Sequence, residues 1–588
     1  MKIQISANKV IVKIKMLMCI FTVLLLTTGC SYEAVNKGRG IGVINVNSIN
    51  KGADVILSAD YTVDSTINSQ VYDFFDVAVR THKGSPNSVP ATFGRRPKVN
   101  TVRMLGGWAS KNTEADTYKW DGSKYVYDFT QATKRIDKWL DKDWDIFQIV
   151  LDNPPWAFQN GLTLVDKPDG IHYLKKDANA VYGNSLPPND SDAWARYIKA
   201  FMEHLVEHYG RDVVLSWRFR VGSEIDTRPQ HWSATREEFF AHYQNTVKAV
   251  HAVLPNAKIG THFREASFKG RYVDYTGNKE DSYARHFVSW AKAHDVHYDF
   301  IAISYYPHIT KPHEMDMEYV YQHDIAPITT HPDWNEKANF EIHEFKFIIK
   351  MKRGGFESVQ TSHSASFFAM FAKMMLTHNI RDVYQWGNAT GGHYAPEALT
   401  QLALYSMLGN QIFDNQVSDI RPSNDDSNII DGIFTKSTKG QDYDVLIYNF
   451  NRKDFTYRQP ENVDVRLKIN TPSKASFKYR IGSIDQSNIA HQKFYQEFPL
   501  SLVDESQGGW RKAGVHITAS PMSLLNEQGV KVYLDNRHKY AKSQDLKWTE
   551  WQDHNIVVEP NGETWVILPT QLPSFAVQKI EVRFVESI

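Results

Sequence analysis

The feature that most constrains this chain is an alternation of short apolar runs with longer segments of helical period, from about residue 62 to residue 408. Such alternation is typical of βα units that build a parallel sheet. Seven strands are expected, at residues 99–105, 146–151, 213–221, 258–262, 300–304, 339–343 and 383–386. We expect the first of eight strands between Val55 and Val63. The predicted fold class is therefore α/β, a (β/α)8 TIM barrel.

The helices expected between these strands carry apolar residues at intervals of three and four. Phe201, Leu205 and Tyr209 show this spacing, which places them on one face of a helix that covers the outside of the barrel. The expected helices are residues 130–140, 193–209, 236–253, 282–293 and 364–377.

Beyond about Asn410 the pattern changes to alternating strands joined by polar turns, which favours a C-terminal β-sandwich. Strands are expected at 443–448, 463–469, 530–534 and 565–569. We divide the chain into a lipoprotein signal peptide (1–30), a tether with N-terminal strands that pair with the sandwich (31–58), the catalytic barrel (59–410) and the sandwich (411–588).

The first thirty residues have the form of an export signal, a basic start followed by the apolar run 16–26. The run is short for a bilayer span and ends in Leu-Leu-Thr-Thr-Gly-Cys, which resembles a bacterial lipobox with Cys30 as the lipidated residue. Cys19 lies inside the signal, so a mature chain would retain Cys30 alone, with no intramolecular disulfide. Ser31 favours an outer-membrane or surface address, and plain secretion is the alternative.

Lys and Arg together number 67, as do Asp and Glu, so the net charge excludes general attraction to nucleic acid. Aromatic residues make up 13% of the chain, more than a core alone needs. Rings that stack on sugars would account for the surplus.

Two glutamates stand where expected strands end, which is where the catalytic groups of a TIM barrel lie. The run Trp217-Arg-Phe-Arg-Val-Gly-Ser leads into Glu224, and Asn339-Phe-Glu-Ile-His leads into Glu344. By the expected strand count these are strands four and seven. Retaining glycosidases need such a pair, one carboxyl group as acid/base and one as nucleophile. A single Glu more often caps a helix or pairs with an Arg, but two at these ends favour catalysis.

The nucleophile must be ionised, so we expect donors from Arg220, His343 and Tyr305 around Glu344. Glu341 competes for this role. Alternation along the strand does not decide, since Ile342 would then share the side of Glu344.

At these residues the chain resembles the four/seven superfamily of retaining glycoside hydrolases, called clan A. The resemblance implies that Glu224 is the acid/base and Glu344 the nucleophile. Ser223 replaces the Asn that usually binds the sugar 2-hydroxyl, and Ile225 replaces a Pro. Residues 102–104, 300–307 and 480–488, with Trp386, resemble family 39, the β-xylosidases and α-L-iduronidases. Residues 152–158 and 221–227 resemble family 86, the β-agarases and β-porphyranases.

Further residues at expected strand ends are candidates for sugar contact, although core packing or surface pairing would also explain them. Rings are expected to form platforms, and His and Arg side chains to bind sulfate or carboxylate groups. The rings are Trp108, Trp156, Tyr305, Tyr306 and Trp386, and the cations are His262, Arg264, Arg228, His231 and His308; Arg103, Asn153, Ser223 and His343 complete the expected substrate-binding set. The histidines lack the spacing of a zinc motif, so we expect neither metal nor cofactor.

The sequence therefore predicts a retaining hydrolase of a structural polysaccharide, with a red-algal galactan (agar, porphyran or carrageenan) as the favoured substrate. Its partners would be the polysaccharide and, through Cys30, a membrane. An exo-acting β-xylosidase is the alternative enzyme. A surface lipoprotein that binds glycans without cleaving them is the alternative from another class.

Overall fold

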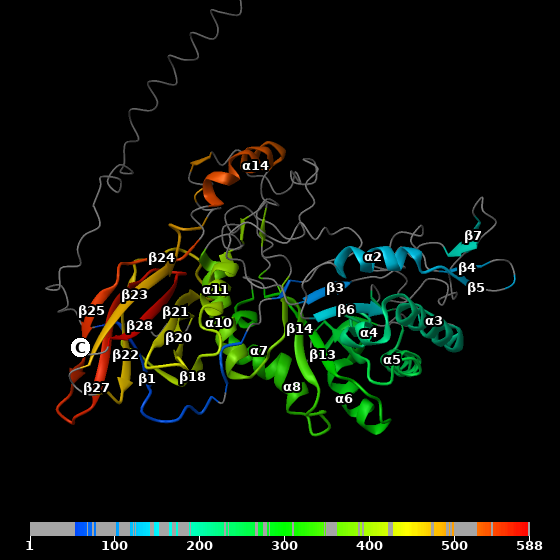
Figure 1. Ribbon diagram of the computed structural model, residues 1–588, viewed down its shortest axis with the longest axis horizontal. Coiled ribbons are helices and arrows are strands. Elements are labelled where there is room, and N and C mark those ends of the chain that lie inside the picture. The colour runs from blue at the N-terminus through cyan, green and yellow to red at the C-terminus, as the bar shows by residue number, and fades with distance from the viewer. Residues whose placement is uncertain are drawn as a thin grey trace, which may run out of the picture. The chain divides into compact units, whose positions relative to one another are not determined.

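The computed structural model of the chain describes most of residues 53–585 and shows two kinds of sheet (Figure 1). The described residues are 53–67, 69–72, 76–77, 101–104, 118–120, 123, 125–140, 146–151, 164–166, 172–174, 187–188, 190–227, 231–232, 234–264, 269–273, 279–281, 283–307, 311–345, 347, 362–385, 389–390, 393–394, 396–421, 427–471, 475–489, 493, 497–498, 526–541 and 545–585. No helix among them is long and apolar enough to cross a membrane. The expected signal, tether and Cys30 lie outside these residues.

Eight parallel strands form one curled sheet. In chain order they are β2 (Asp76–Val77), β3 (Thr101–Met104), β6 (Ile146–Leu151), β9 (Arg218–Val221), β10 (Lys258–Phe263), β13 (Phe300–Tyr305), β14 (Asn339–Phe345) and β15 (Val383–Gln385). Their order in the sheet is β2-β15-β14-β13-β10-β9-β6-β3. The described strands form a parallel half-barrel, consistent with a TIM-barrel fold. In chain order β9 is fourth and β14 seventh.

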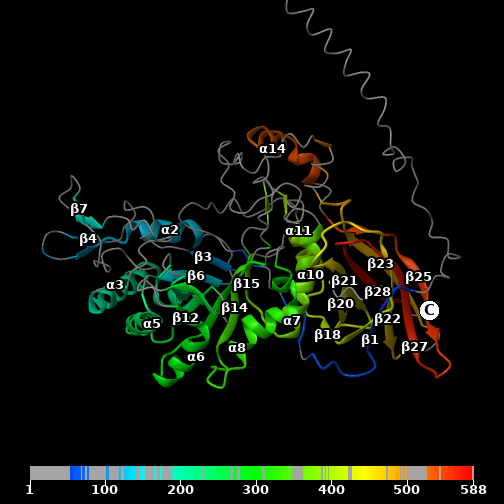
Figure 2. The same ribbon diagram turned by 180° about the vertical axis from the view of Figure 1, so that it is seen from behind.

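Helices lie between these strands and after the last of them, and their buried apolar residues join the core beside the sheet (Figures 1 and 2). They are α2 (Thr130–Leu140), α3 (Ser191–Tyr209), α4 (Arg211–Ser216), α5 (Arg236–His251), α6 (Tyr283–Ala293), η5 (Pro312–Met315), α7 (Met317–Val320), η6 (Tyr321–Ile325), α8 (Ala326–Thr329), α10 (Ser362–Thr377) and α11 (Pro396–Tyr405). Helix α5 begins at a capping box, in which the Thr235 hydroxyl accepts from Glu238 N (3.2 Å) and the Glu238 carboxylate accepts from Thr235 N (2.9 Å). Short hairpins complete this part: β4 (Tyr118–Trp120), β5 (Tyr125–Tyr127), β7 (Leu164–Asp166) and β8 (His172–Leu174) in one sheet, and the pairs β11 (Lys269–Val273) with β12 (Lys279–Asp281) and β16 (Ala389–Thr390) with β17 (His393–Tyr394).

Two mainly antiparallel sheets occupy the C-terminal region and share a buried apolar cluster that includes Val445, Val465 and Leu568. The five-stranded sheet has the order β19 (Asn415–Asp419), β1 (Val55–Asp60), β22 (Glu461–Ile469), β27 (Thr564–Leu572) and β26 (Val557–Val558). The seven-stranded sheet contains β18 (Gln411–Phe413), β20 (Asn428–Lys436), β21 (Tyr443–Asn451), β28 (Val577–Val585), β23 (Ser476–Ile484), β24 (Lys547–Trp548) and β25 (Gln552–Asn555).

Three expected elements differ from the structure. Residues 55–60 are not the first strand of the parallel sheet, because they pair with β19 and β22, and that strand is β2. Residues 213–216 belong to helix α4, since Gly210 begins a new short helix that buries Val214. Residues 530–534 lie in helix α14 (Glu527–Ala541), where Tyr533 is buried, although their apolar residues alternate as in a strand.

Candidate active site

The loop after β9 brings Glu224 to the carboxyl end of the parallel sheet in a constrained backbone. Gly222 has φ +73°, and a Cβ there would lie 2.3 Å from Ile225 Cδ1, so only glycine fits. Glu224 itself has φ +47°, a conformation that costs a non-glycine residue about 1–2 kcal/mol. Ile225 N donates to His262 O (3.3 Å), which holds the loop against β10. Backbone strain of this kind, at a residue other than glycine, is typical of functional sites.

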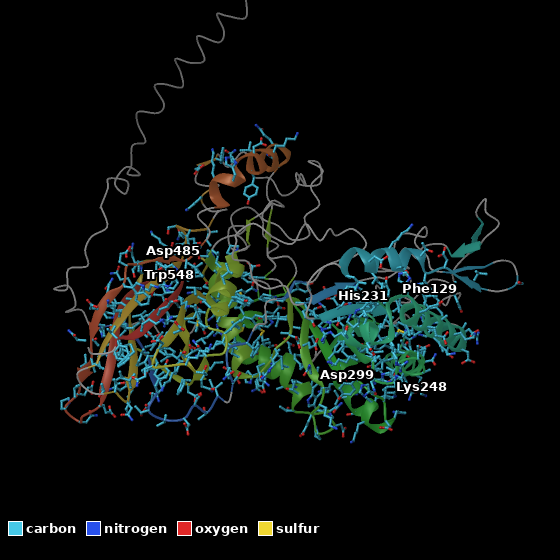
Figure 3. The ribbon with its side chains drawn as sticks, in the orientation of Figure 1. Phe129, His231, Lys248, Asp299, Asp485 and Trp548 are labelled. Carbon is cyan, nitrogen blue, oxygen red and sulfur yellow. The ribbon has the colours of Figure 1, made fainter. Side chains whose placement is uncertain are left out.

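The carboxylate of Glu224 has a cation close to one oxygen and an imidazole near the other. Arg264 Nη1 donates to Oε1 at 2.9 Å, and His231 Nε2 lies 3.9 Å from Oε2 (His231 is labelled in Figure 3). Asp226 accepts a hydrogen bond from the backbone N of Arg264, which fixes the start of the arginine side chain. His231 Nδ1 is 2.6 Å from the Ser223 carbonyl. The loop after β9 therefore supplies Glu224, Asp226 and His231, and the loop after β10 supplies Arg264.

A bulge in β14 explains why alternation along the sequence did not decide between Glu341 and Glu344. Ala302 opposes Glu341 in the pairing of β13 with β14, but Ser304 opposes Glu344, so His343 is an extra residue. Ala302 and Ser304 are two residues apart and share a face. Glu341 and Glu344 therefore also share a face, and their surroundings distinguish them.

The surroundings of Glu344 connect it with Glu224. Tyr306, directly after β13, donates its hydroxyl to Glu344 Oε2 at 2.5 Å. The guanidinium of Arg264 lies 4.8 Å from the centre of the Tyr306 ring. A continuous path of contacts thus runs from Glu224 through Arg264 and Tyr306 to Glu344, across the ends of β9, β10, β13 and β14.

Glu341 instead belongs to a buried cluster of charges. Its two oxygens accept from Arg218 Nη1 and Nη2, both at 2.8 Å, and Oε2 lies 2.6 Å from His343 Nε2. The Tyr384 hydroxyl also donates to Oε2 at 3.4 Å. Burial raises the pKa of Glu341, and the Arg218 guanidinium opposes this effect by favouring the carboxylate. Protein groups engage both oxygens of Glu341, and its side chain has no exposed surface.

The other expected residues divide into three groups. His262 and His343 are buried near the pair: His262 Nε2 lies 3.0 Å from Ser304 Oγ, and His343 Nδ1 lies 3.3 Å from Arg220 Nη1. Tyr305 lies on the opposite face of β13, because alternation turns it away from Ser304. Its ring packs on Phe345 and Phe371 and its hydroxyl donates to Glu314 O (2.6 Å). Trp108, Asn153, Trp156, Arg228, His308, Trp386 and the side chain of Arg103 lie outside the described residues.

Sequence reasoning did not find Ser304, and it assigned other roles to Tyr306 and Arg264. Tyr306 was considered as a ring platform, and its place directly after a strand end was the available signal for a role at the site. Arg264 was expected to meet anions of a substrate, whereas in the structure it pairs with Glu224. Among the described residues, no group of three His, Cys, Asp or Glu side chains is arranged to hold a metal ion.

Known proteins are similar to this chain in sequence and in fold. The sequence model of glycosyl hydrolases family 39 matches residues 100–343, which include Glu224 and end one residue before Glu344. An alpha-1,4-L-rhamnosidase of Formosa agariphila is 34% identical over 438 residues, covering 73% of this chain and 84% of the relative. A beta-xylosidase of Geobacillus stearothermophilus is 29% identical over 140 residues, 24% of this chain and 25% of the relative.

Solved structures support the fold. A monomeric beta-xylosidase from Caulobacter crescentus aligns with a TM-score of 0.53 at 14% identity, covering 90% of this chain and 99% of that one. The family 39 enzyme from Xanthomonas axonopodis pv. citri gives 0.53 and 14%, with 92% and 100% covered. The protein is a glycosidase of clan A. Within that clan the chain belongs to glycosyl hydrolases family 39.

Proposed function

We propose that the protein is a retaining α-L-rhamnosidase in which Glu224 is the acid/base and Glu344 the nucleophile. The path of contacts from Glu224 through Arg264 and Tyr306 to Glu344 is the observation that supports this pair. The sugar is proposed from the alpha-1,4-L-rhamnosidase of Formosa agariphila, which this chain resembles over most of its length.

The reaction requires two displacements at the anomeric carbon. In the first, a Glu344 oxygen attacks that carbon, the glycosidic C–O bond breaks, and Glu224 gives its proton to the departing oxygen. In the second, Glu224 takes a proton from water, whose oxygen displaces Glu344 and releases the sugar with its original anomeric configuration. Arg264 stabilises the carboxylate that Glu224 becomes after the first step. The Tyr306 hydroxyl, 2.5 Å from Glu344, orients the attacking carboxylate.

Hydrolysis of aryl glycosides tests the sugar and the pair together. We expect release from an aryl α-L-rhamnopyranoside, with α-L-rhamnose as the first anomer seen by NMR. Azide should rescue Glu344→Ala and give a glycosyl azide of inverted anomeric configuration. Rescue of Glu341→Ala instead would show that Glu341 is the nucleophile.

A β-xylosidase activity is the second candidate, because the Geobacillus stearothermophilus relative carries that name. An aryl β-D-xylopyranoside tests it directly. The red-algal galactan expected from the sequence remains a prediction, and incubation with agarose, porphyran and carrageenan followed by sizing of the products tests it. A wild type that binds glycans but cleaves none of these substrates would instead support the alternative of a protein that binds glycans without cleaving them.

We also propose that the eight parallel strands close as a (β/α)8 barrel and that the two C-terminal sheets form a β-sandwich. Their shared apolar cluster supports the sandwich. The proposal extends to export and lipidation at Cys30, on the sequence pattern alone. Labelling cells with a palmitate analogue should mark the wild type and leave Cys30→Ser unmarked, and equal labelling of both would refute the anchor.

A further inference from the structure

Two tryptophans are fixed at one edge of the seven-stranded sheet. Strand β24 pairs with Gly482 and Ser483 of β23, and β25 pairs with residues 476–479 of the same strand. Between β24 and β25, Thr549 N donates to Ile481 O (2.9 Å) and Ile481 N donates to Thr549 Oγ1 (3.0 Å). These bonds hold the short connection, so Trp548 and Trp551 at its two ends have set positions.

Arg480 lies against both indole rings. Its Cζ is 4.2 Å from the centre of the Trp548 ring and 4.7 Å from that of Trp551. Its Nε and Nη2 donate to Glu581 Oε2 at 2.8 and 2.7 Å. The bonds to Glu581 therefore use one edge of the guanidinium, while 31% of the arginine side chain remains exposed. The cation is held in one orientation before any ligand arrives.

The two rings differ in exposure. A Cβ at Gly482 would lie 2.9 Å from ring atoms of Trp548, so glycine allows this ring to lie close against β23 (Trp548 is labelled in Figure 3). Trp551 is 41% exposed, which is unusual for so large an apolar side chain. The exposed indole of Trp551 therefore lies beside a fixed guanidinium, and the indole of Trp548 packs against the same guanidinium.

We propose that Trp551, Arg480 and Trp548 form a surface subsite for a polysaccharide that carries anionic groups. The Trp551 ring stacks on the C–H face of a sugar unit, and the guanidinium binds a sulfate or carboxylate of the same chain. In a glycosidase such a subsite keeps a polymer near the enzyme between cleavages. It requires neither the proposed catalytic pair nor the proposed sugar.

A purely structural role makes a different prediction. If the rings and Arg480 only secured β24 and β25 to the sheet, loss of the exposed Trp551 ring would lower stability and leave glycan binding unchanged. Stability and binding must therefore be measured on the same variants.

Affinity electrophoresis of the full chain tests the subsite. All proteins carry Glu344→Gln to prevent hydrolysis, and the gels contain porphyran as a sulfated polymer, polygalacturonate as a carboxylate polymer, or neutral xylan. We expect Trp551→Ala to weaken binding to at least one anionic polymer roughly tenfold, with Trp551→Phe within threefold of the parent. Tyr319→Ala is the matched control, because Tyr319 is also exposed (38%) but lies in α7. Its binding should equal that of the parent.

Thermal midpoints and a second variant complete the test. Midpoints of the Trp551 variants should stay within about 2 °C of the parent, and Arg480→Lys should weaken binding to the anionic polymers but not to xylan. The two anionic gels distinguish sulfate from carboxylate. The proposal would be overturned by unchanged binding in Trp551→Ala or by no retardation of the parent by either anionic polymer. It would also be overturned if Arg480→Lys lost as much binding to xylan as to the anionic polymers. In an active background, cleavage of an aryl glycoside should be the same with and without Trp551→Ala.

Discussion

Replacing Glu341 or Glu344 by Gln, one at a time, should show that two glutamates of the same strand have different roles. Glu341 should contribute to stability and Glu344 to catalysis. Glu341 accepts two bonds from Arg218 at 2.8 Å and has no exposed surface. A Gln amide retains one acceptor oxygen but turns an NH2 group towards the second guanidinium N–H. One charge-assisted hydrogen bond is then lost in a buried site, which costs about 1.5–3 kcal/mol.

We therefore expect Glu341→Gln to lower the free energy of unfolding by about 2 kcal/mol and the thermal midpoint by roughly 2 °C. Its kcat should fall less than tenfold, since Glu341 contacts Arg218 and His343 rather than a substrate. Glu344→Gln should retain a midpoint within about 0.5 °C of wild type, because its amide oxygen can still accept from Tyr306. Its kcat should fall at least about 10³-fold through loss of the nucleophile.

Differential scanning calorimetry and aryl glycoside kinetics on the same preparations measure both quantities. Glu237→Gln is the matched control, since its pair with Arg236 is on the surface and its side chain is 62% exposed. That change should cost at most about 0.5 kcal/mol. An inactive but stable Glu341→Gln together with an active Glu344→Gln would refute the assignment of the two residues.

Two further predictions concern residues that position the proposed pair. Gly222→Ala should destabilise the fold by more than about 1 kcal/mol and reduce kcat, because its Cβ would meet Ile225 at 2.3 Å in a left-handed backbone; thermal scanning and kinetics check this, and a neutral effect would contradict it. Tyr306→Phe should lower kcat roughly tenfold or more, with a smaller change in KM, since it removes the donor to Glu344; kinetics that match wild type would exclude this role.

The regular parts of the fold could be predicted from periodicity, and the irregular parts could not. Helix 130–140 matches α2, since its apolar spacing reflects one buried face, and strand 146–151 matches β6, since its nearly continuous apolar run is buried on both faces. Residues 55–60 alternate like any strand, and only tertiary pairing with β19 and β22 removes them from the parallel sheet. Residues 530–534 have apolar residues two apart, but they lie within helix α14, where Tyr533 is buried.

The site shows the same limit for a physical reason. The positions of Glu224 and Glu344 at strand ends follow from the repeat of βα units, so sequence reasoning reached both. The left-handed φ of Glu224 and the extra residue at His343 break the local rules on which such reasoning depends. Both departures occur at strand ends that carry a glutamate of the proposed pair. Other parts of the fold stabilise them: a hydrogen bond to β10 holds the loop of Glu224, and the buried pair of Glu341 with Arg218 lies next to the bulge. A strand without the bulge would turn Glu344 to the opposite face from Glu341. The bulge in the β13–β14 pairing therefore brings Glu344 to the face where Tyr306 meets it.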